Sequence, residues 1–137
     1  MIFMVDEIVL KVAKRRMREI KTELPHPDIA THFSEGANGI GQIDLFFQGD
    51  LIGREFVETA ISWKDKGRMD EYRRVLQQKL RLVVMAPRID AMKVRMMMLE
   101  LNNWWLFYYM VYGYDSQGRL VRVLRPIPPD KSQSYIT

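Results

Sequence analysis

The sequence predicts an α/β domain in which a mixed β-sheet is covered by helices. Helical and strand-like periodicities alternate along the chain, in the order helix, three strands, helix, strand, helix, two strands. A length of 137 residues fits one domain with a core of its own. Hydrophobic residues make up 47% of the chain and charged residues 28%, as in an ordinary globular protein.

The N-terminal half begins with an amphipathic helix. Apolar residues recur at helical spacing over Val5–Leu24, and Pro25 ends the pattern. Acidic residues in the first turn suit the helix dipole. A glycine-rich segment (34–41) and a turn (48–53) then separate three short strands, which we expect at Ile29–Phe33, Gln42–Phe47 and Arg54–Ser62.

The second half alternates helices and strands. After a loop at 63–67, the expected elements are a helix at Arg68–Lys79, a buried strand at Leu80–Ala86, a helix at Ile89–Leu101, an aromatic strand at Trp104–Tyr114 and a strand at Leu120–Leu124. Pro87 stops the buried strand, and a turn at 115–118 joins the last two. The domain is therefore expected to span 1–125. The proline-containing residues 126–137 are expected to form a loosely held tail.

Composition excludes several classes of site. The chain has no cysteine, so disulfides, zinc–thiolate sites and cysteine nucleophiles are excluded. The two histidines lie on either side of Pro27, which argues against a histidine-based metal site and leaves carboxylates as ligands for Mg²⁺ or Mn²⁺. No signal peptide or membrane span is expected, and we predict a cytoplasmic protein. A net charge of +4 favours an anionic partner such as nucleic acid.

Two acidic residues fall inside strands that are otherwise largely apolar. Asp44 lies within the second expected strand and Glu58 within the third. A charge in a strand interior is costly unless it is paired or bound to a metal. We therefore expect the two carboxylates to form a site. The alternative is that they point to solvent or pair with a nearby arginine such as Arg54.

This succession of elements resembles the PD-(D/E)xK nuclease superfamily, in particular the small archaeal Holliday-junction resolvases and the RecB-like nucleases. The resemblance covers roughly residues 5–112. It implies a restriction-endonuclease-like core, αβββαβα, followed here by C-terminal strands. It also implies that Asp44 and Glu58 hold Mg²⁺ (or Mn²⁺) together with the carbonyl of Thr59, and that Glu7 matches the glutamate of the leading helix.

The sequence departs from that motif at one functional position. The resemblance implies a lysine two residues after the glutamate, and that position is Ala60. Lys64 is the expected substitute and Lys66 a weaker one. With Lys64 in place, the implied activity is metal-dependent hydrolysis of DNA phosphodiesters. If neither lysine reaches the carboxylates, the alternative is a catalytically inactive module of the same fold that binds nucleic acid or forms a homodimer.

Basic residues gather on one face of the first helix, and this face is the expected DNA contact. It comprises Lys11, Lys14, Arg15 and Arg18, to which we add Lys66. The alternative is a merely solvated helix face. For the basic residues of Arg68–Lys79 we favour that second interpretation, with local pairs such as Asp70 with Arg74.

The aromatic strand is longer than a monomer needs. Residues Trp104–Tyr112 are almost without interruption apolar or aromatic. Most of them are expected to form core. Part of their surface is expected to pair with a second copy, so that the protein would be a homodimer.

Overall fold

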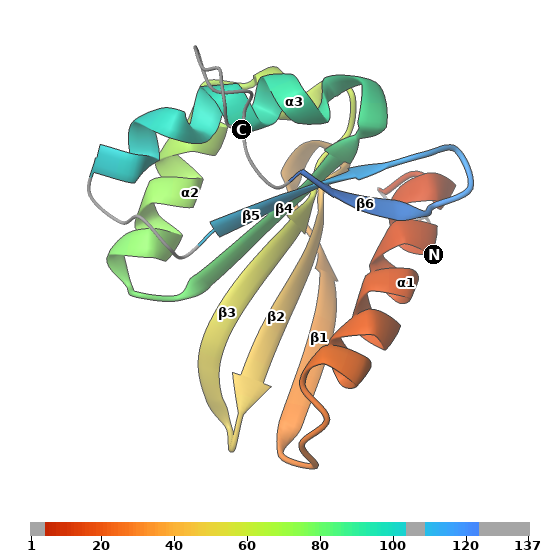
Figure 1. The fold of residues 1–137 in the computed structure, drawn as a ribbon, viewed down its shortest axis with the longest axis vertical. Helices are drawn as coiled ribbons and strands as arrows, with labels where there is room; N and C mark the ends of the chain where they lie inside the picture. Colours follow the sequence, from red (N-terminus) through yellow and green to blue (C-terminus); the bar gives the residue numbers. More distant parts are fainter. Residues whose placement is uncertain (1–4, 104–108, 124–137) are drawn as a thin grey trace, which may run out of the picture.

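The computed structural model describes residues 5–103 and 109–123, and Figure 1 shows their arrangement. Within these ranges the chain forms three α-helices: α1 (Glu7–Glu23), α2 (Gly67–Gln77) and α3 (Arg88–Met97). Its six strands are β1 (Ile29–Glu35), β2 (Gly41–Phe47), β3 (Asp50–Val57), β4 (Arg81–Pro87), β5 (Tyr109–Tyr114) and β6 (Leu120–Val123). Short 3₁₀ helices lie at Ala37–Gly39, Ser62–Lys64 and Met98–Asn103.

The six strands form one mixed sheet in the order β1-β2-β3-β4-β5-β6. Antiparallel pairs join β1 to β2, β2 to β3 and β5 to β6, whereas β3, β4 and β5 run parallel. The predicted α/β class and mixed sheet are thus confirmed.

The helices lie on the two faces of the sheet, α1 on one and α2 and α3 on the other (Figure 1). Helix α2 connects β3 to β4, and α3 connects β4 to β5. Both connections step across the sheet in the same direction. Because such crossovers are nearly always right-handed, both helices fall on the same face, and α1 covers the other.

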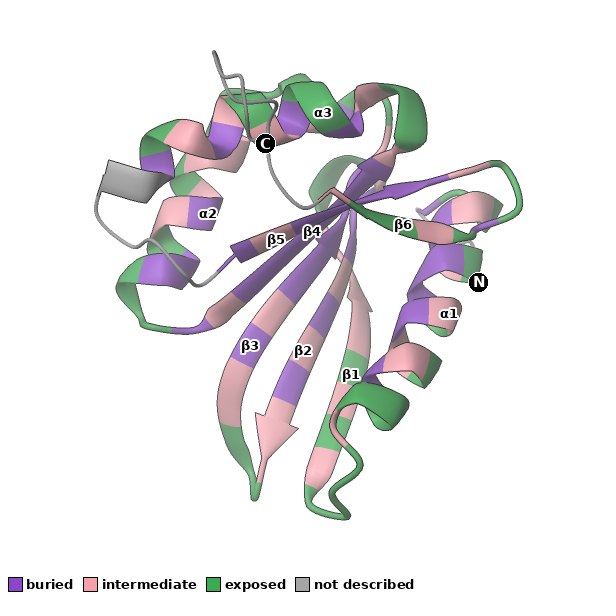
Figure 2. Cartoon of the chain, in the orientation of Figure 1, coloured by how far each residue is buried: buried purple, intermediate pink, exposed green. Residues whose placement is uncertain are grey.

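Each face of the sheet has its own hydrophobic core, and the buried residues run through the middle strands between the helices (Figure 2). On the α1 face, Val9, Val12 and Ile20 pack against alternate residues of β2, β3 and β4. On the other face, Tyr72 and Leu76 of α2 pack against Phe56 and its neighbours. This alternation is why β4, buried on both faces, is an almost unbroken apolar strand.

Helix α1 approaches the sheet closely at Gly41. A Cβ atom placed on Gly41 would lie 2.8 Å from Cγ1 of Val9 and 3.1 Å from the Phe33 ring. Any larger residue would push the helix away from the strand. The start of β2 therefore lies directly under the first turns of α1.

The bounds of β3 differ from those predicted for the third strand. It begins at Asp50 and ends at Val57, whereas Arg54–Ser62 was expected. The turn before it consists of Gln48 and Gly49, which both have positive φ angles, as a tight two-residue hairpin requires. Glu58 therefore follows the strand and does not lie inside it.

The aromatic strand proves to be interior. Its described part, β5, pairs with β4 on one side and β6 on the other, and Tyr109, Val111 and Tyr112 are buried. Val111 and Tyr112 thus pair on both sides and offer no strand edge to a second copy, whereas Tyr109 and Met110 pair with β4 only among the described residues. The rest of the predicted dimer contact, Trp104–Tyr108, lies outside the described residues. The predicted tail also lies outside them. No helix in the described ranges combines the length and apolar character that crossing a membrane requires.

Candidate functional site

The carboxylate of Glu58 is enclosed between β3, α2 and the turn that follows β3. Its Oε1 accepts a hydrogen bond from the Ser62 hydroxyl at 2.7 Å. Its Oε2 accepts bonds from Arg68 Nε at 2.9 Å and from the Tyr72 hydroxyl at 2.6 Å. Nη2 of Arg68 also lies close to Oε2, at 2.7 Å. Glu58 is fully buried, and both of its oxygens are engaged by protein donors.

The surrounding groups show the influence of this buried charge. Burial, and after it the negative charge of Glu58, raises the pKa of Tyr72 well above 10.0. Burial alone would lower the pKa of Arg68, but the charge and hydrogen bond of Glu58 outweigh it and raise that pKa. Tyr114 of β5 donates to the backbone carbonyl of Glu58 at 2.7 Å, and its pKa is also raised, by burial first and by Glu58 second. Glu58 thus connects β3, α2 and β5.

This arrangement predicts a loss of stability in alkali. The two tyrosines keep their protons in the fold above pH 10, where an unfolded tyrosine ionises. A folded pKa above the unfolded one gives stability that is present below pH 10 and is lost as the pH rises. We expect the melting temperature to fall above pH 10, and to fall less steeply in Tyr72→Phe. An equal slope in the two proteins would contradict the role assigned to Tyr72.

Asp44 lies on the same face of the sheet as Glu58 but not beside it. It is paired across the strands with Arg54, whose Nε donates to Oδ1 of Asp44 at 2.8 Å, and Gln42 donates to the same oxygen at 3.1 Å. Arg54 precedes Glu58 by four residues. At about 3.3 Å per residue, the backbone positions of Arg54 and Glu58 are on the order of 13 Å apart, and Asp44 lies opposite Arg54. The structure thus shows the alternative expected for Asp44, which was an ion pair with Arg54.

The remaining residues of the predicted site lie apart from these carboxylates. Ala60 is exposed at the lysine position. Lys64 is exposed too, with its ammonium 5.7 Å from the centroid of the Trp63 ring, and no ion pair among the described residues joins it to Asp44 or Glu58. Glu7 lies on the α1 side of the sheet, opposite the side to which Glu58 points.

These positions do not fit a shared Mg²⁺. A metal ion needs several oxygens that converge with free lone pairs. Here the oxygens of Glu58 already accept bonds, and Asp44 is held by Arg54 at a distance. Across the described ranges, no group of three or more acidic or histidine side chains is placed to hold a metal ion.

A depression of about 550 Å³ marks the end of the sheet where the motif lysine was expected. It is lined by Asp6, which immediately precedes α1, and by Ala60, Ile61 and Asp65 of the segment that follows β3. Its floor includes Ser62, which binds Glu58 beneath it. The depression is open and holds acidic and apolar side chains, without a lysine or arginine among those that line it.

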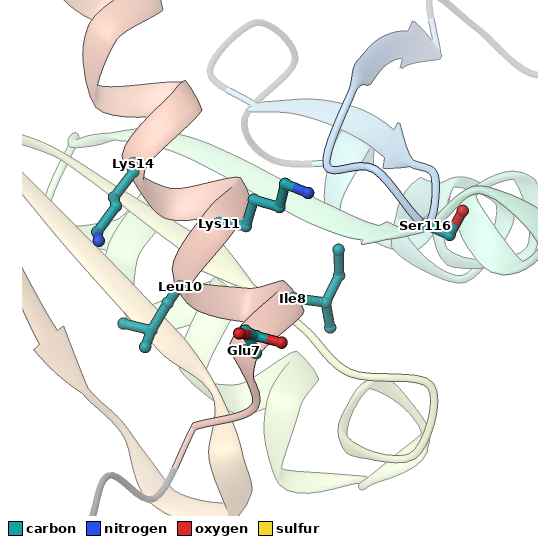
Figure 3. A pocket seen from close by; sticks show the side chains of 6 residues that line it. All are labelled: Glu7, Ile8, Leu10, Lys11, Lys14 and Ser116. Carbon is teal, nitrogen blue, oxygen red and sulfur yellow. The ribbon is translucent and has the colours of Figure 1, made fainter.

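The exposed face of α1 is basic. Lys11, Lys14 and Arg18 are exposed and Arg15 is half-buried, and no ion pair within the described part of the chain involves any of them. Beside the helix start, a depression of about 500 Å³ is lined by Glu7, Lys11, Lys14 and Ser116 among others. Lys11 extends toward Ser116, whereas Lys14 extends to the other side of the helix (Figure 3).

The basic residues of α2 differ, because they are paired locally as expected. Arg73 pairs with Asp70 and with Glu100, and Arg74 pairs with Glu71. The particular partner suggested for Arg74, Asp70, is instead the partner of Arg73. The exposed cations of α1, in contrast, have no such local partners within the described part of the chain.

Sequence reasoning missed a second buried ion pair, on the α1 face. Arg16 and Glu55 are both buried, and Nε of Arg16 donates to Glu55 at 2.6 Å while Nη2 donates at 3.1 Å. Glu23 binds the same guanidinium at 2.9 Å. This guanidinium lies 5.0 Å from the centroid of the Tyr112 ring. Arg16 falls in the apolar stripe of α1 with Val12 and Ile20, and this signal was available in the sequence.

Comparison of the chain with protein-family models, with curated proteins and with solved structures finds no match.

Proposed function

We propose that this protein is a DNA-binding module that does not hydrolyse DNA. The observation that carries the proposal is the enclosure of Glu58, which the resemblance expects to hold the metal together with Asp44. Its oxygens are engaged by Ser62, Arg68 and Tyr72, and it is fully buried. A carboxylate in this state stabilises the fold, because releasing it for a metal would leave Arg68 a buried charge without its partner.

The exposed face of α1 supports DNA as the ligand. Lys11, Lys14 and Arg18 follow one another at intervals of three and four residues, so their Cβ atoms lie about 5–6 Å apart, and the side chains of Lys11 and Lys14 spread to the two sides of the exposed helix face. Because no carboxylate of the described residues neutralises them, their positive potential reaches the solvent. Such a row attracts the phosphate backbone and releases counterions when it binds.

The test is the salt dependence of binding. Anisotropy of a labelled duplex is measured over a range of salt concentrations for the wild-type protein and for the triple variant Lys11→Gln, Lys14→Gln, Arg18→Gln. If each residue contacts one phosphate, we expect the slope of log K against log salt to fall by about 3 in total. The control, Arg73→Gln, Arg74→Gln, Lys79→Gln, removes the same charge around α2 and should keep the wild-type slope. An unchanged slope in the α1 variant would refute the proposed contact face.

A metal-dependent nuclease is the second candidate, favoured by the order of the elements and by the shared sheet face of Asp44 and Glu58. The two functions separate in a cleavage assay with linear, branched and single-stranded DNA in Mg²⁺, in Mn²⁺ and in chelator. We expect no cleavage in any of them, and binding that is equal with and without metal. Metal-dependent cleavage that disappears in a folded Asp44→Ala variant would instead establish the nuclease.

A further inference from the structure

We propose that Ile61 is an apolar wedge that enters between base pairs at an unstacked step of the bound DNA; this inference rests on the proposed DNA-binding function. Ile61 is 82% exposed, at the tip of the turn between β3 and α2. Apolar side chains that DNA-bending proteins insert between base steps are of this type and stand free of their surroundings in the same way.

The turn holds Ile61 in one position. Its backbone N–H donates to Oγ1 of Thr59 at 3.3 Å, and its carbonyl accepts from the N–H of Lys64 at 3.1 Å. Thr59 also accepts from the N–H of Ser62, whose own side chain accepts from the N–H of Thr59 and donates to Glu58. The buried carboxylate therefore anchors the base of the turn. Because the backbone at the tip is already held, it loses little further conformational freedom when the side chain enters a base step.

The charges around Ile61 suit DNA that meets the protein at the tip of this turn. Lys64 and Lys66 follow it on the same loop, both exposed and without an ion-pair partner among the described residues, and can reach phosphates on either side of a step. Asp6 and Asp65, in the depression beside the tip, would repel a phosphate. They can accept hydrogen bonds from the amino groups of bases at the opened step, so base edges, not backbone, suit this point.

The wedge and the basic face of α1 lie close enough for one DNA molecule to contact both. Asp6 lines the same depression as Ile61 and immediately precedes α1. Lys11 follows Asp6 by five residues, or about 8 Å along the helix. The major groove of DNA alone is about 12 Å wide, so one duplex that covers the depression also extends to the first basic residue of α1.

The test compares two duplexes that differ only by a central mismatch. Binding of the wild-type protein, Ile61→Ser and Ile89→Ser is measured by anisotropy, with 2-aminopurine beside the mismatch reporting unstacking. Ile89 is the matched control because it is the same residue with similar exposure, 86%, on α3. We expect the wild-type protein and Ile89→Ser to prefer the mismatched duplex about tenfold and to raise the fluorescence. Ile61→Ser should bind both duplexes alike, with the affinity of the wild type for the paired duplex.

The outcomes separate this proposal from the function on which it rests. If Ile61→Ser keeps the preference for the mismatch, or if the wild-type protein has none, Ile61 is not a wedge, although salt-sensitive binding through α1 would stand. If the wild-type protein binds neither duplex, both proposals fail. Because the side chain of Ile61 is largely free of contacts, its removal should leave the melting temperature unchanged, and this is measured alongside.

Discussion

Replacing Glu58 with Ala is expected to destabilise the protein by about 3–5 kcal/mol, enough to unfold much of it at moderate temperature. The substitution removes the acceptor of Ser62, Arg68 and Tyr72 at once. The guanidinium of Arg68, which rests against Phe56 and Tyr72, would then be a largely buried charge without its counter-ion. A solvated metal ligand would behave differently, since its removal ends binding and spares the fold.

Denaturant unfolding followed by circular dichroism measures this effect, with two variants for comparison. Glu58→Gln keeps the size of the side chain but not its charge, and should fall between the wild type and Glu58→Ala. Asp44→Ala removes a strand carboxylate whose side chain is 16% exposed and pairs with Arg54, and we expect a loss of at most about 1 kcal/mol. If Glu58→Ala is as stable as the wild type, while Mg²⁺ raises the wild-type melting temperature, Glu58 is a metal ligand after all.

Replacing Arg16 with Ala is the second change for which we expect a loss of about 3–5 kcal/mol. It leaves the carboxylate of Glu55 buried on the α1 face without Arg16, its only hydrogen-bond partner among the described residues. It also opens a gap against the Tyr112 ring. Burial acts to lower the pKa of Arg16, but the hydrogen bonds and charge of Glu55 outweigh burial and raise the pKa above its ordinary value. The guanidinium therefore stays charged at every pH at which the protein folds.

A double substitution distinguishes the cost of an orphaned charge from the worth of the pair. Arg16→Met with Glu55→Leu fills the same space with apolar side chains, and we expect it to recover most of the stability lost in Arg16→Ala. The free energies of unfolding of both single variants and the double variant form a cycle that measures the coupling. A double variant that is less stable than either single variant would show that the ion pair itself stabilises the fold.

Most of the secondary structure could be predicted from periodicity. The spacing of Val9, Val12 and Ile20 defines the buried side of α1, and the unbroken apolar run before Pro87 defines β4. The partner of Asp44 was also within reach, because Arg54 lies directly opposite it on the next strand. These features depend on neighbours that are close in sequence or joined by a short hairpin.

The end of β3 and the buried charges could not be predicted in the same way. The alternation of Phe56 to Ile61 continues past Val57, but the side chains of Thr59 and Ser62 bind backbone N–H groups and replace the strand ladder with a turn. The position of Arg16 in the apolar stripe of α1 signals its burial, but its partner Glu55 is 39 residues away and is identified only by the fold. The enclosure of Glu58 by α2 is likewise a tertiary effect.

The two buried glutamates near the end of β3, Glu55 and Glu58, together fix the register of that strand relative to its neighbours. Glu55 points to Arg16 on one side of the sheet and Glu58 to Arg68 on the other. A slip of one residue would turn each carboxylate to the opposite side, away from its arginine and into the wrong apolar layer. An apolar strand such as β4 has no comparable penalty for slipping. The pair of charges therefore selects a single strand register, independently of how much either contributes to stability.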